Sequence, residues 1–556
     1  MKRTIISMAL ALAAISAGAQ SMYDGINFSE NNYYGTARSI SLGNAVTALG
    51  GDLGMTGINP AGSAVSRQSQ ISITPGVSIS ATSSAYAPAA GASAGLANKE
   101  TRARFVIPNG GISLRFSTGR RDGLRAVTFS ALSNTTNRFL NTSSATGVNA
   151  GSSMQGAFAS RADNEKMPPE IFNQMTNPWA DSNYSWNILA AYGSNGIGYF
   201  SDSGRYLGSN QALDGSTPGE LRQTSARDYF GSKNDIILNL GFNFEDRFYM
   251  GANLGLPIMS YSYSEYFNEN AVNPTQFPVQ IIKDSKTVDT YFTGFNYEYG
   301  YGASSNGVYG KFGFIWLPFE GLRLGAAIKT PTAYTVTEKW NVYERTYFEN
   351  SSVNAASGPP TNGVYRYKMR SPYEINAGLA FNFGAVGLIS ADYEMMDYSV
   401  IRFSEMNERR NAPASYFAAV NRVCSLFAGV SHSLRLGAEF NIGSNFAVRG
   451  GFGLVTSPER YYVQADGVRI YAGDYVDGET VLTGSEAKYV KANRFSYSLG
   501  FGYRSDGSFF ADLGGRLTKY PVTYFYPYQE YSAAGTPELS LDRKLIDVAL
   551  TVGWRF

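Results

Sequence analysis

Few residues in this sequence have the types and spacing needed for catalysis. The chain has one histidine, His432, between Ser431 and Ser433, and one cysteine, Cys424. A histidine beside a serine suggests an esterase or phospholipase, but neighbours on a strand point to opposite faces, so these three residues cannot form a catalytic pair. A single cysteine excludes an intramolecular disulfide, and with one histidine it excludes a Cys/His zinc cluster. We therefore predict no enzyme activity, no structural metal and no cofactor.

Two further kinds of ligand can be set aside. Gly500-Phe501-Gly502 lies in a strand-like alternation with no helix after it, whereas a dinucleotide site needs a Gly-rich turn that opens a helix. The chain carries 46 basic and 44 acidic residues, and two of the basic ones, Lys2 and Arg3, lie in the leader described below. The remaining charges balance, so the sequence has no electrostatic footprint for nucleic acid.

The first nineteen residues have the pattern of a signal peptide. Lys2 and Arg3 precede a short apolar run over 5–15, and small residues at 17–19 precede Gln20. The apolar run is shorter than the roughly 20 residues that a transmembrane helix needs. We predict that residues 1–19 are removed. No later stretch is apolar enough for a helical span, so a membrane protein with this sequence must cross the bilayer as a closed barrel.

The C-terminal residues predict a lipid-facing strand. From Ile546 to Phe556 every second residue is apolar and the run ends in aromatics, which a soluble sandwich strand would not explain. The same alternation recurs along the chain, mostly in pairs joined by tight turns. Fourteen segments show it: 71–80, 102–116, 124–133, 235–244, 248–256, 308–316, 322–328, 373–383, 387–393, 434–441, 446–455, 495–504, 509–518 and 546–556. Strands of about ten residues would cover the roughly 25 Å apolar band of an outer-membrane barrel.

The connections between these segments alternate between short and long. The long ones are 81–101, 135–233, 259–306, 331–371, 398–431, 456–492 and 519–544. This asymmetry is typical of periplasmic turns and extracellular loops. Residues 184–192 could form a fifteenth strand, but Trp186, Leu189 and Ala190 have helical spacing, so we predict a helix there. A connection of about a hundred residues is expected to fold over or into the barrel mouth.

Residues 20–69 precede the first strand and predict a compact, partly helical element. Leu42, Val46 and Leu49 are apolar at helical spacing, and Asn59-Pro60 would end any helix before it. A disordered leader would lack such an apolar stripe. We therefore predict that residues 20–69 plug a barrel formed by residues 70–556.

This element resembles the N-terminal hatch of the FadL/TodX family of outer-membrane transporters for hydrophobic compounds. The matching residues are 35–38 (GTAR), 42–45 (LGNA), 48–52 (ALGGD) and 59–62 (Asn-Pro-Ala-Gly). Segments at 330–334, 391–399 and 449–458 also look like strand motifs of this family. One departure is Ser63, where an apolar residue commonly follows the Asn-Pro-Ala-Gly stretch.

The resemblance implies an all-β, monomeric, 14-stranded antiparallel barrel in the cell outer membrane. It implies passive uptake of hydrophobic small molecules such as long-chain fatty acids, captured near the extracellular loops and released by a hatch movement or a lateral gap. Asn59, Pro60, Ala61 and Gly62 would form the hatch or gate near that passage. Outer-membrane lipid would surround the wall, and the strand ending in Phe556 resembles the signal read by the barrel-assembly machinery.

Other functions remain open beside transport of hydrophobic molecules. A general or substrate-selective porin for polar solutes would have an open, charged lumen. The alternation places six charged residues there: Arg323, Lys329, Arg435, Glu439, Arg449 and Arg516. We expect them to pair with one another or to hold the N-terminal element, because a general porin needs no plug. A surface adhesin with aromatic loops such as 461–462 and 524–526, and a lipid-hydrolysing enzyme, are the remaining alternatives.

Overall fold

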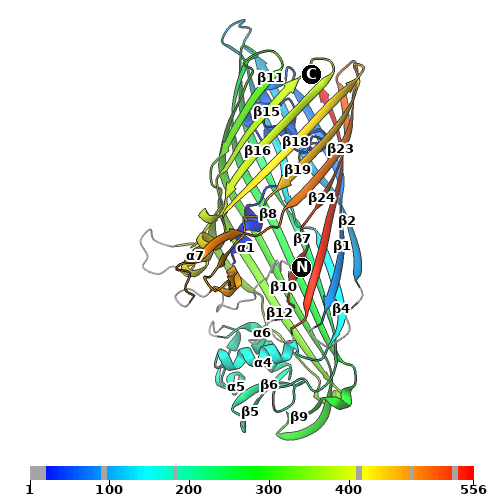
Figure 1. Ribbon diagram of the computed structural model, residues 1–556, viewed down its shortest axis with the longest axis vertical. Helices are drawn as coiled ribbons and strands as arrows, with labels where there is room; N and C mark the ends of the chain where they lie inside the picture. Colours follow the sequence, from blue (N-terminus) through cyan, green and yellow to red (C-terminus); the bar gives the residue numbers. More distant parts are fainter. Residues whose placement is uncertain are drawn as a thin grey trace.

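The alternating segments pair into one closed antiparallel ring (Figure 1). The computed structural model describes residues 21–88, 95, 97–180, 184–407, 416–475, 480–528 and 536–556, so the signal peptide predicted at 1–19 lies outside the described residues. The ring strands, in order, are β1 Gln70–Ala87, β2 Asn98–Ser117, β3 Leu124–Arg138, β7 Leu221–Phe244, β8 Phe248–Ala271, β10 Lys286–Trp316, β11 Leu322–Lys329, β15 Glu374–Asn382, β16 Gly387–Asp397, β18 Val430–Ile442, β19 Phe446–Val455, β23 Arg494–Arg504, β24 Phe509–Lys519 and β26 Glu538–Arg555.

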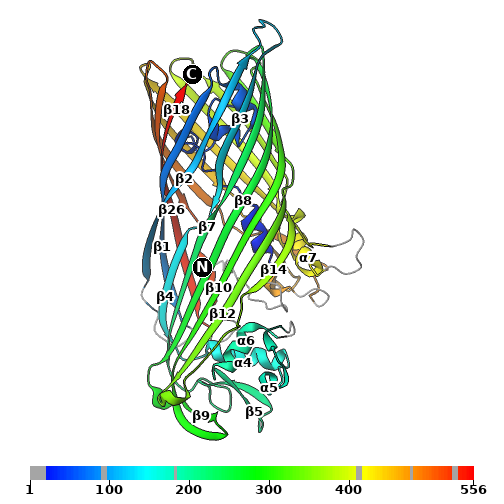
Figure 2. The same cartoon turned by 180° about the vertical axis from the view of Figure 1, so that it is seen from behind.

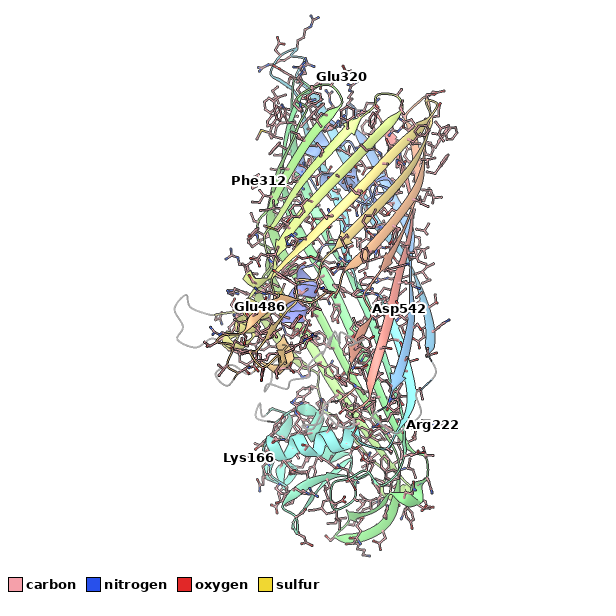
Figure 3. All side chains as sticks on the ribbon, in the orientation of Figure 1. Lys166, Arg222, Phe312, Glu320, Glu486 and Asp542 are labelled. Carbon is pink, nitrogen blue, oxygen red and sulfur yellow. The ribbon has the colours of Figure 1, made fainter. Side chains whose placement is uncertain are left out.

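Each strand of this ring pairs with the next, and β26 pairs with β1, which leaves no free edge. Every predicted segment overlaps one of these strands, so the 14-stranded antiparallel barrel is confirmed. The outer face is apolar: Leu254 and Leu256 of β8 are exposed while Asn253 points inward, and Phe312 of β10 projects from the wall (Figure 3). Such a band suits lipid.

The prediction of about ten residues per strand is wrong on one side of the barrel. β7 and β8 have 24 residues each and β10 has 31. The outward apolar residues end near residue 258, and over 261–264 the exposed positions are serine and the buried ones tyrosine, but backbone pairing continues. The predicted connections 259–306 and 331–371 are therefore largely strand. Shorter strands extend this tall side: β4 Asn141–Asn149, β9 Pro278–Lys283, β12 Ala333–Phe348, β13 Ala355–Ser357, β14 Gly363–Arg370, β17 Arg402–Glu405 and β25 Thr523–Phe525.

Residues 150–220, which we call the cap, form a small helical unit at the end of the tall side (Figures 1 and 2). The cap contains α4 Met154–Asn164, α5 Ile171–Gln174, η2 Pro178–Ala180, α6 Trp186–Gly193, β5 Ile197–Phe200 and β6 Arg205–Gly208. The helix predicted at 184–192 is confirmed by α6. Its buried Ile188 and Leu189 pack in one cluster with Phe292 and Phe295 of β10. The long connection thus packs against the extended strands.

A second group of connections lies beside α1, where the shorter strands end (Figure 1). It contains η5 Tyr398–Val400, α7 Ala418–Phe427, β20 Arg460–Val463, β21 Arg469–Ile470, η6 Ala472–Asp474 and β22 Glu486–Tyr489, and its apolar residues pack against α1 Met22–Ser29. The 3-10 turns η3 Pro274–Gln276 and η4 Ser351–Val353 lie beside the tall strands. Within the described part of the chain, no helix is both long enough and apolar enough to cross a bilayer.

The cap is expected to be less stable at high pH. Burial raises the pKa of Glu269, at the base of the cap, to about 7, although the Met154 N–H and the Gln223 amide donate to its carboxylate. The folded state therefore keeps a proton that the unfolded chain releases near pH 4.3. This stabilisation is present below that pH and is lost as pH rises through about 7, a change of about 3 kcal/mol.

The measurement is thermal unfolding of the cap, followed by tryptophan fluorescence at pH 5 and pH 8. We expect the wild type to unfold at the lower temperature at pH 8, and Glu269→Gln to show a smaller difference between the two values. Glu170→Gln, a change at an exposed carboxylate on the same cap, should behave like the wild type. Equal pH responses in the wild type and Glu269→Gln would show that Glu269 is not the source of the pH dependence.

Residues 21–69, which we call the N-terminal segment, lie inside the ring. After α1 the segment contains α2 Ala37–Ser41, α3 Leu53–Thr56 and η1 Pro60–Val65. Leu42, Val46 and Leu49 are all buried, but Leu42 and Leu49 lie in turns and Val46 lies in the irregular stretch between them, so their helical spacing does not correspond to a helix. Gly43 and Asn44 have φ of 62° and 59°, a left-handed conformation that ends the helix after α2. The apolar spacing therefore identified the buried residues and not their helical form.

Candidate functional site

The four residues of the Asn-Pro-Ala-Gly stretch hold the N-terminal segment against the wall. Asn59 donates from its amide to the Thr47 carbonyl at 2.7 Å and to the Phe314 carbonyl of β10 at 3.0 Å, and its side-chain oxygen accepts from Ala61 N–H. Pro60 starts η1, where its missing N–H has no cost, and its carbonyl accepts from Asn239 of β7 at 2.9 Å.

The same stretch also closes the segment on itself. The Gly62 carbonyl accepts from Gly51 N–H at 2.8 Å. Ser63, the departure from the family pattern, shares a hydrogen bond with Thr128 of β3 at 3.0 Å. The polar residue therefore has a wall partner that an apolar residue would lack.

Glycines on the inner wall let the N-terminal segment approach closely. A Cβ on Gly251 would overlap the carbonyl group of Pro60, and one on Gly325 would overlap the carbonyl oxygen of Thr47. Similar overlaps would arise at Gly437 with Leu42 and at Gly451 with Gly43. The wall is therefore shaped to receive the backbone of this segment, as expected where glycine permits close contact.

Gly251→Ala is expected to loosen the N-terminal segment by about 1–3 kcal/mol, because the new methyl group meets backbone that cannot rotate away. The measurement is the rate at which a protease cleaves residues 21–69 in the folded, detergent-solubilised protein. Gly450→Ala is the control, since its Cβ has no atom within 4 Å. Cleavage at the wild-type rate in Gly251→Ala would contradict the close contact.

A buried ion pair lies beneath this segment. Lys311 of β10 and Glu374 of β15 are 2.7 Å apart, with side chains 1% and 0% exposed. Glu374 also accepts from the Tyr33 hydroxyl and from the amide of Asn31 at 2.7 Å, while Lys311 reaches the Gly57 carbonyl at 3.3 Å. Two charges on the wall are thus matched by groups of the N-terminal segment.

The six charged residues predicted in the lumen all lie there, but they do not form one site. Arg435 pairs with Glu394 at 2.7 Å, and Glu439 pairs with Arg38 and Arg449. Arg516 donates to the Asn32 carbonyl, Arg323 donates to the Leu49 carbonyl, and Lys329 lies 4.1 Å from the centre of the Tyr309 ring. Three of them bind residues 21–69 through hydrogen bonds or ion pairs, namely Arg323, Glu439 and Arg516. Arg435 also lies 5.5 Å from the centre of the Tyr33 ring.

The residues first considered for catalysis lie as the strand geometry requires. Ser431 is buried and donates to the Thr456 carbonyl, whereas His432 points to the outside and contacts the Tyr393 hydroxyl at 2.7 Å. The serine and the histidine are therefore on opposite faces of β18.

A cavity of about 320 Å³ lies between α1 and the wall, towards the long-connection end. We call it the outer cavity. Its walls are mainly apolar or aromatic, formed by Ile26, Phe139, Leu140, Tyr229, Tyr261, Phe525 and Leu541. Neither the Asn-Pro-Ala-Gly stretch nor the six predicted charges line it. Polar and charged residues line the rest of it, including four arginines and the carboxylates Asp24, Glu30 and Glu459. Apolar walls with polar groups that fix a ligand's orientation are typical of small-molecule sites.

Four arginines line the outer cavity: Arg138, Arg227, Arg494 and Arg543. They differ in whether a carboxylate pairs with them. Arg227 binds Glu265 through two nitrogens, and Arg494 binds Glu30 at 2.5 Å. Arg138 shares Asp547 with Arg516, so one carboxylate serves two guanidinium groups.

Arg543 is the least neutralised of these four arginines. Among the described residues it has no carboxylate partner: one nitrogen donates to the Leu140 carbonyl, and Nε has no acceptor. Its guanidinium lies 4.2 Å from the centre of the Tyr520 ring. The outer cavity therefore combines an apolar wall with an unneutralised cation.

The barrel wall is irregular beside this cavity. Pairing between β2 and β3 stops at Asn109 and Asn134, next to Pro108, which has no N–H to donate. Residues 134–141 are all buried, so the alternation of buried and exposed residues is lost there, although β3 still pairs with β7 up to Arg138 through a bulge between Thr135 and Asn137. The N–H groups of Asn32 and Tyr34 donate to the carbonyls of Thr136 and Thr135, which fixes this segment against residues 21–69.

Three solved structures are similar to this chain. A Pseudomonas aeruginosa FadL homologue is 10% identical over 94% of this chain and 98% of its own, with a TM-score of 0.48. The Ralstonia pickettii toluene transporter TbuX is 13% identical over 94% and 98%, with a TM-score of 0.42. The Pseudomonas putida toluene transporter TodX is 12% identical over 95% and 98%, with a TM-score of 0.43. The chain is similar to these channels along nearly its whole length. No family model and no curated protein matches the sequence.

Sequence reasoning missed the arginines of the outer cavity. Arg543 lies in a stretch assigned to a long connection, and Arg494 directly precedes a predicted strand. The alternation of β26 could have identified Arg543. Asp547 faces the lumen, and every second residue before it, Leu545 and Arg543, lies on the same face. The complete burial of residues 134–141 had no such signal, because residues 135–233 were predicted as a long connection.

Proposed function

We propose that this chain is an outer-membrane channel for the passive uptake of hydrophobic small molecules such as long-chain fatty acids, with residues 21–69 acting as a hatch. The observation that carries the proposal is the outer cavity, which joins apolar walls to the unneutralised Arg543 on the outer side of the hatch. An alkyl chain suits the walls, and a carboxylate suits the guanidinium.

The hatch gives the channel its selectivity in this proposal. Its residues fill the lumen and are bonded to β7, β10, β11 and β15. A general porin needs a continuous aqueous path, so the filled lumen disfavours that alternative. No energy-coupling motif is evident in the sequence, and uptake would then follow the concentration gradient.

The break between β2 and β3 supports a route out of the lumen through the wall. Residues 137–141 line the outer cavity, and they lie beyond the point where β3 stops pairing with β2. A ligand released there would enter the bilayer without crossing the aqueous space, and a shift of Asn32 and Tyr34 away from β3 would free the segment to move.

The test is uptake of labelled oleate by Gram-negative cells that express the chain and lack a fatty-acid channel of their own. We expect saturable uptake above the level of cells without the chain. Liposomes containing the purified protein should not swell in the tetrasaccharide stachyose. Free passage of stachyose together with no saturable oleate uptake would replace the proposal with a porin.

A further inference from the structure

A second cavity, of about 490 Å³, is lined by residues at the opposite end of the barrel, among them Arg555 next to the C-terminus. The C-terminus lies at the end away from the cap (Figure 1). We call this space the short-turn cavity. It is bounded by residues 49–51 and 65–68 of the N-terminal segment and by the ends of β11, β16, β18, β23 and β26. Gly51 and Gly384 border it, and a Cβ on either would have no atom within 4 Å, so the space beside them is open.

The charges that line the short-turn cavity are unbalanced. Five of its residues are arginines, namely Arg38, Arg67, Arg323, Arg504 and Arg555, and only one, Glu439, is acidic. Glu439 is already engaged, because Arg38 binds it through two nitrogens and Arg449 binds it at 2.5 Å. Asp512, which lies nearby, pairs with Arg449.

Four of the five arginines therefore lack an anionic partner. Among the described residues, no carboxylate forms an ion pair with Arg67, Arg323, Arg504 or Arg555. Arg323 donates to the Leu49 carbonyl, and Arg555 lies 4.8 Å from the centre of the Phe510 ring. Gathering like charges around one cavity is unfavourable unless an anion occupies it, and guanidinium groups bind phosphate and carboxylate through paired hydrogen bonds.

We propose that the short-turn cavity is a binding site for an anion that bears a phosphate or carboxylate group. The anion approaches from the short-turn end and is held by Arg67 of the hatch together with Arg504 and Arg555 of the wall. Because one of these arginines belongs to the hatch and two belong to the barrel, a bound anion also links the two. This site is separate from the outer cavity and is not needed for the proposed uptake.

Titration calorimetry of the full mature chain in neutral detergent tests the site, with orthophosphate as the probe. We expect saturable binding, weakened at least about tenfold in Arg67→Gln/Arg504→Gln, because two charge-assisted contacts are lost. The control is Arg120→Gln/Arg121→Gln, which removes two exposed charges from a turn at the same end and should stay within about twofold of the wild type. Choline chloride should give no saturable heat.

A single variant and a second ligand complete the experiment. Arg67→Gln alone changes an exposed residue with no ion-pair partner, so it reports binding if the double variant does not fold. Dodecyl phosphate distinguishes the source of the anion: tighter binding than orthophosphate that still depends on Arg67 and Arg504 indicates an amphiphile leaving the lumen, and equal binding indicates a free anion. Absent saturable phosphate binding, or equal affinities in both double variants, would overturn the proposal.

Discussion

Replacing Arg543 by glutamine is expected to weaken the binding of a long-chain fatty acid about tenfold. Arg543 is the cation of the outer cavity that has no carboxylate partner among the described residues, and its Nε has no acceptor. A charged hydrogen bond contributes about 1.5–3 kcal/mol, and about 1.4 kcal/mol already corresponds to a factor of ten in affinity. The measurement is equilibrium binding of oleate to the purified protein.

The comparison with an uncharged ligand separates charge recognition from general damage. Oleyl alcohol has the same alkyl chain, so its affinity should change by less than about twofold in Arg543→Gln. Lys544→Gln removes the neighbouring exposed cation on β26 and should bind both ligands like the wild type. Equal losses for the acid and the alcohol would show that Arg543 shapes the cavity and does not bind the acid group.

Replacing Lys311 by methionine is expected to release the hatch. Lys311 is 1% exposed and pairs with Glu374, which also holds Tyr33 and Asn31 of the hatch. Without the lysine, Glu374 loses its ion-pair partner and keeps only the weaker attraction of Lys329, which lies opposite it on β11. Breaking a buried pair costs up to about 3–5 kcal/mol. The hatch should detach before the barrel unfolds, because the ring of strands does not depend on it for backbone pairing.

Electrical recording in planar bilayers measures this release. We expect frequent open-channel currents in Lys311→Met and almost none in the wild type. The double variant Lys311→Met/Glu374→Gln removes both charges, so it should recover much of the closed behaviour. Currents in Lys311→Met as rare as those of the wild type would mean that the ion pair does not hold the hatch.

The barrel could be predicted from the sequence because its lipid-facing strands follow a simple rule. Ile546 to Trp554 alternate with small or polar residues, and lipid on one side with a packed lumen on the other requires that alternation. The extended strands could not be delimited in the same way. Beyond Ile258 of β8, over 260–264, the exposed positions carry serine and the buried ones tyrosine, so the apolar signal of a lipid-facing strand is absent although the strand continues.

The site was less predictable than the barrel. The glycines and the Asn59 motif indicated a closely packed hatch. They did not indicate that the chain from Leu42 to Val46 would be non-helical, because that depends on the left-handed conformation of Gly43 and Asn44. The outer cavity joins α1, β3 and β26, which are far apart in the sequence, and only the closed ring brings Arg543 next to Leu140. Local sequence patterns carry no information about contacts between residues so far apart in the sequence.

The most direct test of the central claim is a crystal structure of the protein with a long-chain fatty acid that carries bromine at its methyl end. The account predicts an anomalous bromine peak among Ile26, Phe139 and Leu541 in the outer cavity, with the carboxylate at Arg543. Bromine found only on the lipid-facing wall, with an empty outer cavity, would contradict it.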